Sequence, residues 1–496
     1  MKRVVTAQEM RDYERERFRD GRADSLEWME RAARGIDEFL RVRYPEKSVL
    51  TVCGGGNNGG DGFALLRLLK ERGIHSAGVL LAEPDRLTGD AKTNYLRSLD
   101  AGVRWYDTLT DETITQYDVV ADAMFGTGLS RPLAGVYADA ALRINNSGRP
   151  VVAVDIPSGV DATSGAILGR AVQADATVTF EFLKRGHLLF PGRGLCGETV
   201  VYPLSGENDE TSTEVGFLES ADISRLLPSR PIDSHKGNNG RALLCVGCEQ
   251  YAGAALLSAG AALRAGAGLT TAAVPGRVKS AFSALPEAMA IAVSDGSDWN
   301  ETACEAAVKL LPQRNAVCVG CGVGAGNIMP LIGSVLNAKL PAVLDADALN
   351  QMSRTPEMLR KLHPNVVLTP HPAEMARLSG EMIETILSDP IGIALTYAKK
   401  WNCVVLLKGA TSCLSNGKSV RLNTTGNAGL AKGGSGDVLS GLITGLLAQG
   451  LTAFDAACAG AYLLGASAEE AFSLLRERML LARDVIEAVA QTIHKI

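Results

Sequence analysis

Polar side chains inside a glycine-rich segment are the chain's most informative feature. Residues 54–62 (GGGNNGGDG) follow the apolar run 49–53, and they precede a helical pattern in which Phe63, Leu66 and Leu69 share one face. A strand, a glycine turn and a helix in this order point backbone N–H groups at an anion. We expect glycine there for close approach of a ligand or for a positive φ. The G-x-G-x-x-G spacing also predicts a dinucleotide-binding turn, while its amides and carboxylate can orient a ligand or coordinate a cation.

Three later segments carry polar groups at the ends of predicted strands. Asp122 opens DAMFGTGLSRP, Asp155 opens DIPSGVD and Lys184 opens KRGH. Ligands of open α/β sheets bind at the carboxyl ends of strands, so these segments could complete one site. Asn58, Asp122 and Ser158 are oxygen donors for a cation, and Asp155 is a general base if burial raises its pKa toward neutrality. The alternative is that each acid only caps the turn that follows it.

A second glycine-rich segment, residues 432–441 (KGGSGDVLSG), opens a predicted helix. The N–H groups from Gly434 to Asp437 can form an anion hole. The Asp437 carboxylate within it could take the proton of a substrate hydroxyl that attacks a γ-phosphate. The alternative is a helix start capped by Ser435 or Asp437. The chain contains no G-x-x-x-x-G-K-[S/T] motif, so any nucleotide chemistry is of another kind.

Further candidates surround this segment. Lys408 follows the predicted strand 403–407, and Asp345 and Asp347 follow another strand, although Asp347 could simply cap. His371 lies between two prolines, which excludes it from a regular helix and places it on a rigid strand-end turn. We expect His371 to be the functional histidine, and we assign no comparable role to the others, His187 included.

These residues need a scaffold of alternating strands and helices. The pattern predicts an α/β chain of two unlike domains, residues 1–210 and 220–496, joined by a polar linker over 205–214. The first domain is predicted to be a doubly wound parallel sheet, and a long helical tail after Gly436 closes the second. Strands are predicted at 49–53, 76–82, 117–122, 150–155 and 175–181, and then at 242–246, 269–274, 316–319, 341–345, 366–369 and 403–407.

Composition narrows the class of protein. Among 496 residues, 50 Lys and Arg face 55 Asp and Glu, a net charge of −5 that argues against a nucleic-acid or polybasic membrane role. The N-terminal residues resemble neither a signal nor a transit peptide, and the apolar stretch 438–454 is predicted to be a buried helix, so we expect a cytoplasmic protein. Two C-x-x-C pairs, at 245–248 and 318–321, are interpreted as small apolar residues at strand ends in a reducing compartment.

The first set of motifs resembles a known family. GGGNNGGDGF, DAMFGTGL and VDIPSGVDA together look like the NAD(P)H-hydrate epimerase domain, and residues 28–33 (WMERAA) resemble its LMERAG segment, with Trp28 and Ala33 as departures. The resemblance implies a potassium ion held by Asn58, Asp122 and Ser158, and it makes Asp155 the acid/base candidate. It implies substrate contacts from Asn57, Asn58, Gly59, Gly60, Asp61, Gly126, Thr127, Gly128, Leu129, Ser130, Arg131, Pro132 and Asp155.

The second set resembles the ribokinase-like fold and, within it, the ADP- or ATP-dependent NAD(P)H-hydrate dehydratase. The matching pieces are DSHKG, VLDADALN, LTPHPAEMARL, LLKGATS and GNAGLAKGGSGDVLSG. The departures are Cys321 and Val323 in place of Pro and Leu, Ala373 in place of Gly, and Asn238 and Asn239 in place of Thr and Tyr. The resemblance implies magnesium at this site, nucleotide contacts from Lys408, Gly409, Ala410, Thr411, Ser412 and Gly436, and hydrate contacts from Ala254, Gly324, His371 and Asp437.

The combined prediction is a Rossmann-like doubly wound domain followed by a ribokinase-like α/β domain that together repair damaged nicotinamide cofactors. The first would interconvert the R and S forms of hydrated NADH and NADPH. The second would phosphorylate the hydroxyl of the S form with ADP or ATP and then lose phosphate. Expected partners are these small nucleotides, with no nucleic acid, no membrane, and assembly as a homo-oligomer. The alternatives are a C-terminal sugar or vitamin kinase, a non-catalytic nucleotide sensor and, least favoured, a plain NAD dehydrogenase.

Overall fold

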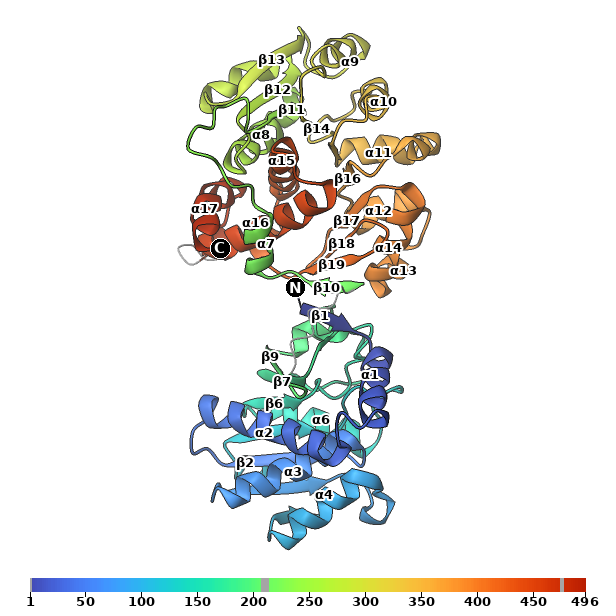
Figure 1. Cartoon of the computed structure of the whole chain (residues 1–496), viewed down its shortest axis with the longest axis vertical. Coiled ribbons are helices and arrows are strands. Elements are labelled where there is room, and N and C mark those ends of the chain that lie inside the picture. Colours follow the sequence, from blue (N-terminus) through green and yellow to red (C-terminus); the bar gives the residue numbers. More distant parts are fainter. Residues whose placement is uncertain (1, 207–213, 473–476) are drawn as a thin grey trace. The chain divides into compact units, whose positions relative to one another are not determined.

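The computed structural model describes residues 2–206, 214–472 and 477–496, and it divides the chain into two compact units (Figure 1). The units are Lys2–Thr211 and Ser212–Ile496. Most of the predicted linker, residues 207–213, lies outside the described residues. Each unit has its own sheet, and each is described by itself.

The N-terminal unit is built on a parallel sheet. Its order is β4-β3-β2-β5-β6-β7-β9, so the chain moves outward from β2 to β4 and then returns to β5 on the other side of β2. The strands predicted from the sequence are present within two residues, whereas β4 and β9 were not predicted. The bounds are β2 Val49–Cys53, β3 Ser76–Leu80, β4 Arg104–Tyr106, β5 Val119–Ala123, β6 Val151–Val154, β7 Ala176–Phe180 and β9 Glu198–Tyr202.

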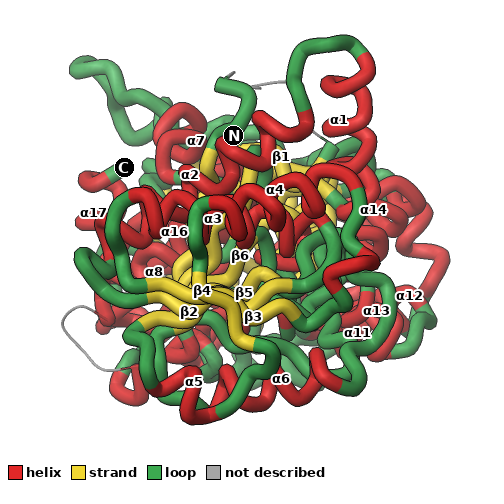
Figure 2. Tube along the Cα trace, turned by 90° about the horizontal axis from the view of Figure 1, so that it is seen from below, coloured by secondary structure: helices red, strands yellow, loops and turns green. Residues whose placement is uncertain are grey.

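Helices cover both faces of this sheet (Figure 2). Helices α2 (Ser25–Arg43), α3 (Asn57–Glu71) and α4 (Gly89–Asp100) lie on one face, and α5 (Asp111–Thr115) and α6 (Val136–Asn146) on the other. Successive strand residues point to opposite faces, so Val49 packs in the first core and Leu50 in the second. Burial on both faces explains the apolar strands and confirms the doubly wound arrangement.

The amino-terminal segment adds two elements to this unit. Strand β1 (Lys2–Val5) pairs in parallel with the short β8 (Leu183–Lys184). Helix α1 (Ala7–Arg19) begins with a reciprocal capping box in which Thr6 and Glu9 bond each other's backbone N–H. The box fixes where α1 starts and therefore which of its side chains face the sheet.

The glycine turn after β2 is shorter than predicted. Helix α3 begins at Asn57, so the amides and the carboxylate lie in its first turns, and none of the glycines from 54 to 62 has a positive φ. Close packing is the reason for glycine instead. A Cβ at Gly54 would lie 2.1 Å from the Met124 carbonyl oxygen, and one at Gly59 would lie 1.9 Å from the Gly54 carbonyl oxygen. The glycines let the helix start against the β5 loop.

The C-terminal unit has a larger mixed sheet. Its order is β13-β12-β11-β14-β15-β16-β17-β18-β19-β10, parallel from β13 to β17 and antiparallel through β17, β18 and β19. All six predicted strands are present within one residue. The bounds are β10 Val215–Phe217, β11 Arg241–Cys245, β12 Leu269–Pro275, β13 Met289–Ser294, β14 Ala316–Val319, β15 Ala342–Leu344, β16 Val366–Leu368, β17 Val404–Leu407, β18 Ser412–Ser415 and β19 Val420–Asn423.

Small residues bring the helices of this unit close to the sheet. Helix α15 crosses α8 at Gly441 and Gly445, where a Cβ would lie 2.2 Å from the Ser258 and 2.6 Å from the Ala262 carbonyl oxygen. Together with α16 and α17 they form one core against the sheet, and helices α9 to α14 lie on its other side (Figure 1). The bounds are α7 Ser220–Leu226, α8 Ala252–Arg264, α9 Glu301–Val308, α10 Met329–Asn337, α11 Asp347–Ser353, α12 Pro372–Ser379, α13 Ile383–Ser388, α14 Pro390–Trp401, α15 Ser435–Ala448, α16 Ala453–Phe472 and α17 Ala482–Lys495.

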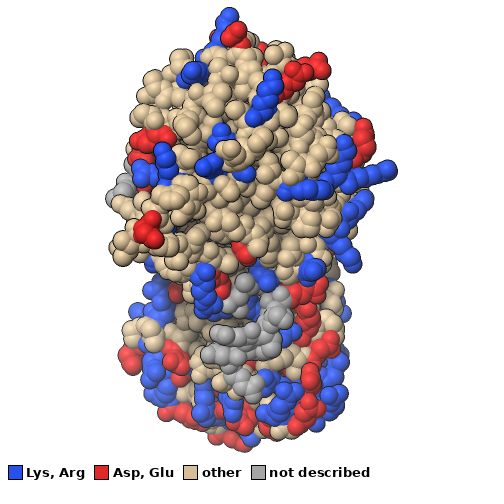
Figure 3. All heavy atoms as spheres, turned by 45° about the horizontal axis from the view of Figure 1, so that its top comes forward, with Lys and Arg blue, Asp and Glu red and all other residues tan. Residues whose placement is uncertain are grey.

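Charged side chains lie on the surface of the chain, and its cysteines lie inside. Acidic and basic side chains are interspersed over the face shown in Figure 3. Within the described residues, no helix is long and apolar enough to cross a membrane. All ten cysteines are free and buried; Cys245 ends β11, and the sulfur atoms of Cys318 and Cys321 are 4.0 Å apart.

Candidate active sites

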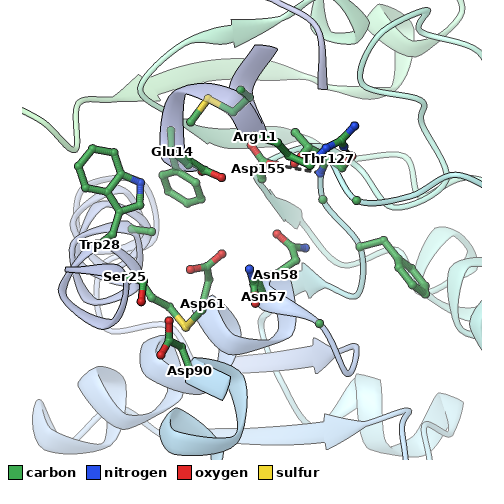
Figure 4. A pocket seen from close by; sticks show the side chains of 18 of the residues that line it. Arg11, Glu14, Ser25, Trp28, Asn57, Asn58, Asp61, Asp90, Thr127 and Asp155 are labelled. Carbon is green, nitrogen blue, oxygen red and sulfur yellow. Dashed lines mark hydrogen bonds between the residues drawn. The ribbon is translucent and has the colours of Figure 1, made fainter. Parts of the chain in front are cut away.

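A cavity of 410 Å³ opens in the N-terminal unit at the carboxyl ends of β2, β5 and β6, where the strand order reverses. In open α/β sheets, ligands usually bind at the point where the strand order reverses. Helices α1, α2 and α3 supply the other walls (Figure 4). Of the residues predicted to contact substrate, the cavity is lined by Asn57, Asn58, Asp61, Gly126, Thr127, Gly128, Leu129 and Asp155.

Five predicted contacts do not line the cavity. Gly59 packs on the Gly54 carbonyl, and a Cβ at Gly60 would lie 2.6 Å from the Met29 sulfur, so both serve the packing of α3. The other three are Ser130, Arg131 and Pro132, which continue the loop beyond Leu129.

Asp155 is the most constrained residue of the site. Its φ of 68° is in the left-handed region, which a side chain other than glycine rarely adopts. Its Oδ1 accepts hydrogen bonds from Lys184 Nζ at 2.7 Å and Thr179 Oγ1 at 3.1 Å, and its Oδ2 accepts one from the Thr127 N–H at 3.2 Å. The carboxylate is therefore held on both oxygens.

The expectation that burial makes Asp155 a near-neutral base is wrong. Burial alone would raise its pKa, but the Lys184 ammonium and the hydrogen bonds lower the pKa below the ordinary aspartate value. Lys184 is only 1% exposed and also donates to Thr179 Oγ1 and the Phe180 carbonyl. The sequence placed Lys184 at a strand end without giving it a role, because only the fold shows that it is buried against Asp155.

His187 also has a role that the sequence did not reveal. Its Nδ1 accepts a hydrogen bond from the Lys184 N–H at 3.0 Å, and its Nε2 lies 2.8 Å from the Asp155 carbonyl oxygen. An accepting Nδ1 puts the ring proton on Nε2, which then donates to that carbonyl. Burial, followed by the Lys184 charge, lowers the pKa of His187 to about 4, so the ring is neutral. His187 thus ties the backbone of Asp155 to that of Lys184.

The three predicted cation ligands lie beside this arrangement. Ser158 donates from its N–H and Oγ to Asp122 at 2.8 and 2.7 Å. Burial raises the pKa of Asp122 to about 6 against the opposing effect of these bonds. Asn58 Nδ2 is buried without a partner among the described residues, and a Cβ at Gly126 would lie 3.0 Å from Asn58 Oδ1. A buried carboxylate next to neutral oxygen donors suits a monovalent cation, which would supply the missing positive charge.

The C-terminal unit gathers its own charged cluster at the ends of β15, β16 and β17. Lys408 Nζ lies 3.0 Å from Asp345 Oδ1 and 3.7 Å from Glu374 Oε2. The second oxygen of Asp345 accepts a hydrogen bond from Ser440 Oγ at 2.8 Å. A Cβ at Gly436 would lie 3.6 Å from this Asp345 oxygen and 3.8 Å from Lys408 Nζ, so the start of α15 reaches the cluster. From the sequence, Asp345 was predicted only as a strand-end candidate without a role, and neither Glu374 nor Ser440 was singled out.

Asp437 lies in the first turn of α15. Burial, followed by the Asp345 charge, raises the pKa of Asp437 to about 6. The alternative that Ser435 or Asp437 caps the helix is wrong, because the N-cap is Gly434, with φ 98°, and no side chain bonds the end. The first N–H groups of α15 therefore remain available for an anion.

His371 lies on the predicted rigid strand-end position and begins a helix. It is the N-cap of α12, with Pro372 in the first helical position, and its Nδ1 accepts bonds from the N–H groups of Ala373 and Glu374 at 3.2 and 3.3 Å. Its Nε2 lies 3.5 Å from Glu374 Oε1. Burial lowers the pKa of His371 against the opposing charge of Glu374. A neutral ring with Nε2 outermost can still donate a hydrogen bond to a ligand.

The remaining predicted hydrate contacts lie around the turn after β14. Gly324 lines a cavity of 740 Å³ together with Asp347, Asn350 and Arg377, and its N–H donates to Asp347 Oδ2 at 2.7 Å. The alternative that Asp347 only caps its own turn is wrong, because no side chain caps α11 and Asp347 bonds the turn after β14 instead. Ala254 lies on α8 against Gly322, while the substituted Cys321 and Val323 are both fully buried.

Two strand-end sites, each pairing a lysine with a carboxylate beside a cavity or a helix start, are typical of an α/β enzyme that acts on small molecules. Residues 242–490 match the family described as NAD(P)H-hydrate dehydratase, and residues 25–186 match that described as YjeF-related protein N-terminus. The chain belongs to the family of bifunctional NAD(P)H-hydrate repair enzymes. This membership confirms the resemblance and disfavours the sugar kinase and sensor alternatives.

Individual relatives agree over nearly the whole length. A protein of Moorella thermoacetica named bifunctional NAD(P)H-hydrate repair enzyme Nnr is 36% identical, over 99% of this chain and 97% of the relative. The protein of that name from Escherichia coli is 33% identical, over 94% of this chain and 89% of the relative. A crystal structure of the ADP/ATP-dependent NAD(P)H-hydrate dehydratase from Bacillus subtilis, co-crystallized with ATP/Mg²⁺, is 30% identical with a TM-score of 0.50, over 57% of this chain and 98% of that one.

Proposed function

We propose that the N-terminal unit epimerises the R and S forms of hydrated NADH and NADPH, and that the C-terminal unit dehydrates the S form at the expense of ADP or ATP. One observation carries the proposal: each unit places the carboxylate of a matched motif at a strand-end site beside a lysine. These are Asp155 with Lys184, and Asp437 beside the pair Lys408 and Asp345. Epimerisation in one unit would feed the single epimer that the other accepts.

In the epimerase site, Asp155 is the carboxylate that meets the reacting carbon. Its lowered pKa keeps it ionised at neutral pH, so it stabilises positive charge on the substrate ring and does not supply a proton. Lys184 and Thr127 fix its two oxygens, and the φ of 68° fixes its backbone. Such preorganised charge is worth most in a site that excludes water.

Potassium is proposed for Asn58, Asp122 and Ser158. The buried Asp122 carboxylate and the Ser158 hydroxyl bonded to it support this choice, and Asn58 Oδ1 would be the third ligand. A bound cation would lower the pKa of Asp122 and hold the β5 and β6 loops together. Replacing potassium with tetramethylammonium should slow epimerisation at least tenfold and leave dehydration of the S form unchanged. Equal epimerase rates in both salts would count against the site.

In the dehydratase site, Asp437 is the base. The phosphates of the nucleotide would lie against the N–H groups that open α15 and against Lys408, whose charge Asp345 and Glu374 stabilise despite burial. Asp437 would take the proton of the substrate hydroxyl as its oxygen attacks the terminal phosphorus, and loss of phosphate then restores the ring. His371 and Gly324 are proposed to position the hydrate.

Magnesium is proposed to accompany the nucleotide. Among the described residues, no group of three or more His, Cys, Asp and Glu side chains could hold a metal alone. Mg²⁺ commonly binds through substrate phosphates and one or two protein carboxylates. A magnesium ion that arrives with the nucleotide therefore needs no larger cluster of protein ligands. When bound, it would neutralise charge on the transferred phosphoryl group. Dehydration should then depend on both magnesium and nucleotide.

The test is incubation of mixed-epimer NADH hydrate with ADP or ATP, following recovery of NADH by its absorbance. The complete enzyme should recover both epimers quickly. D155N should recover the S fraction quickly and the rest only at the uncatalysed rate, whereas D437N should recover none. Accumulation of a phosphorylated product without NADH would favour a kinase, and unchanged recovery by both variants would favour a sensor.

Two finer expectations stay proposals. Location in the cytoplasm is supported by ten free, buried thiols, which suit a reducing compartment. A homo-oligomer is tested by light scattering of the purified chain, and a mass near 52.2 kDa at all concentrations would count against it.

A further inference from the structure

Epimerisation at a carbon that carries a hydroxyl and a ring nitrogen needs a proton donor for the departing oxygen, and Asp155 is not one. We infer that Glu14 and Asp61 form the proton-transfer pair of the epimerase site, one as a carboxylic acid and the other as a carboxylate, on opposite sides of the substrate ring. This inference rests on the proposed epimerase function of the N-terminal unit.

The geometry places the two carboxyl groups in one cavity. Glu14 comes from α1 and Asp61 from the first turns of α3, and both line the 410 Å³ cavity. In Figure 4 the two side chains point into the cavity from opposite walls, with Asp155 to one side. A flat ring placed between them would have one carboxyl group on each face. Asn58, nine-tenths buried with an unpartnered amide, independently indicates that the cavity receives a polar ligand.

The nearest cations, Lys184 and Arg11, lower the pKa of Glu14, but neither is bonded to the pair. Within the described part of the chain, neither carboxyl group forms a hydrogen bond or an ion pair, and the Lys184 ammonium is already bonded to Asp155. The other charged groups that line the cavity are Arg11, which bonds the Thr127 carbonyl, and Asp90 from α4. Each carboxylate that faces the same cavity makes ionisation of the other less favourable.

The proton affinities agree with this arrangement. Burial raises the pKa of Glu14 to about 7, with Lys184 lowering it and Asp155 raising it. Burial, followed by the charges of Asp155 and Glu14, raises the pKa of Asp61 well above the ordinary value. Both shifts favour a protonated carboxyl group in this cavity, and a pair with one carboxylic acid and one carboxylate is the state that donates on one face and accepts on the other.

The step balances without any added reagent. The Asp61 proton passes to the substrate hydroxyl, the C–O bond breaks with its electron pair on the departing water, and the ring-nitrogen lone pair forms a C=N bond. Water then attacks the opposite face, the C=N pair returns to nitrogen, and the proton of the new hydroxyl passes to the Glu14 carboxylate. The other epimer uses the pair in reverse order, and Asp155 stabilises the cation between the two steps.

The test uses the full chain without ADP or ATP, so that the dehydratase is silent. Purified S-form NADPH hydrate in ¹⁸O-labelled water is followed by chromatography and mass spectrometry. The wild type should incorporate one ¹⁸O with each epimerisation, and its kcat should fall below about pH 7 as the Glu14 carboxylate takes up a proton. E14Q and D61N should each lose 100-fold or more in kcat, with KM changed less than threefold and the fall near pH 7 absent in E14Q.

D12N is the matched control, because Asp12 lies on the same helix with a side chain that is 52% exposed to solvent. It should epimerise like the wild type. The thermal transition of each variant shows whether it folds. If D61N does not bind the hydrate, its loss of activity is uninformative, and the activity of E14Q is the test of the inference. Epimerisation without ¹⁸O uptake, or E14Q within threefold of the wild type, would overturn the inference. A wild type that does not epimerise at all would instead overturn the proposed function.

Discussion

Each site pairs a lysine with an aspartate, buried in the first site and half-buried in the second, but the two sites use the pair differently. In the N-terminal unit Lys184 bonds Asp155 itself and lowers its pKa, which makes Asp155 a fixed anion. In the C-terminal unit Lys408 bonds Asp345, and Asp437 stays free of it with a pKa raised to about 6. The same two residue types therefore produce a charge stabiliser in one site and a near-neutral base in the other.

Removal of the Lys184 ammonium should show that this charge lowers the pKa of Asp155 and stabilises the N-terminal unit. K184M leaves a buried carboxylate unpaired and should destabilise the N-terminal unit by about 3–5 kcal/mol. In the wild type the lowered pKa of Asp155 contributes stability above the unfolded value of about 4, and this contribution is lost as pH falls through the folded value. In K184M burial raises the pKa, so the variant should lose stability as pH rises. Urea unfolding from about pH 3 to pH 7 measures both signs.

The pH dependence of the dehydration rate should follow the ionisation of the Asp437 carboxyl group. A base must be ionised, so kcat for the S form should be level above about pH 6 and should fall about tenfold for each unit below it. D437N should lose about 10²–10⁴-fold in kcat with nucleotide binding retained. D298N, which changes an exposed aspartate of the same unit, is the control. A level profile down to pH 4.5 would contradict the assignment.

At the scale of elements, glycines decide how helices approach the sheets. Gly54 and Gly59 let α3 start against the β5 loop, and Gly441 and Gly445 let α15 cross α8. In each case the atom in the way is a backbone carbonyl oxygen, which cannot rotate aside as a side chain could. Glycine at these positions sets the distance between elements that carry the site residues, and it does so without contacting a ligand.

Two alanine substitutions in the turn before α3 should differ sharply. A Cβ at Gly54 would lie 2.1 Å from the Met124 carbonyl oxygen, whereas one at Gly56 would meet nothing within 4 Å. G54A should therefore cost about 3 kcal/mol or more, since the backbone has to shift. G56A should stay within about 0.5 kcal/mol of the wild type. Calorimetry measures both, and equal stabilities would refute the packing argument.

At the scale of the whole molecule, each of the two units has its own sheet, its own apolar core and its own candidate site. Among the described residues, the apolar clusters of Lys2–Thr211 contain no residue of the cluster that packs α8, α15, α16 and α17 against the second sheet. Each unit therefore has its own source of stability and its own site, which suits one chain that performs two successive reactions.

Calorimetry of the full chain should show two thermal transitions. ATP with Mg²⁺ should raise only the transition of the C-terminal unit, by about 2.7 kcal/mol at a hundredfold excess over the dissociation constant. K184M should lower only the other transition. A single transition that both changes move together would show that the units unfold as one.

The sequence by itself determined the strand-end motifs, the alternation of elements and the family, because glycine spacing and apolar periodicity are local. Asp155, Asp437 and those residues of the first cavity that lie in the glycine-rich motifs were predicted for the same reason. Only the tertiary structure decided the pKa of Asp155, since the opposing ammonium comes from Lys184, 29 residues later in the chain. It also brought Glu14 from α1 to Asp61 on α3, and it gave His187 a positioning role. Burial and charge pairing depend on neighbours distant in sequence, so no local pattern carries them.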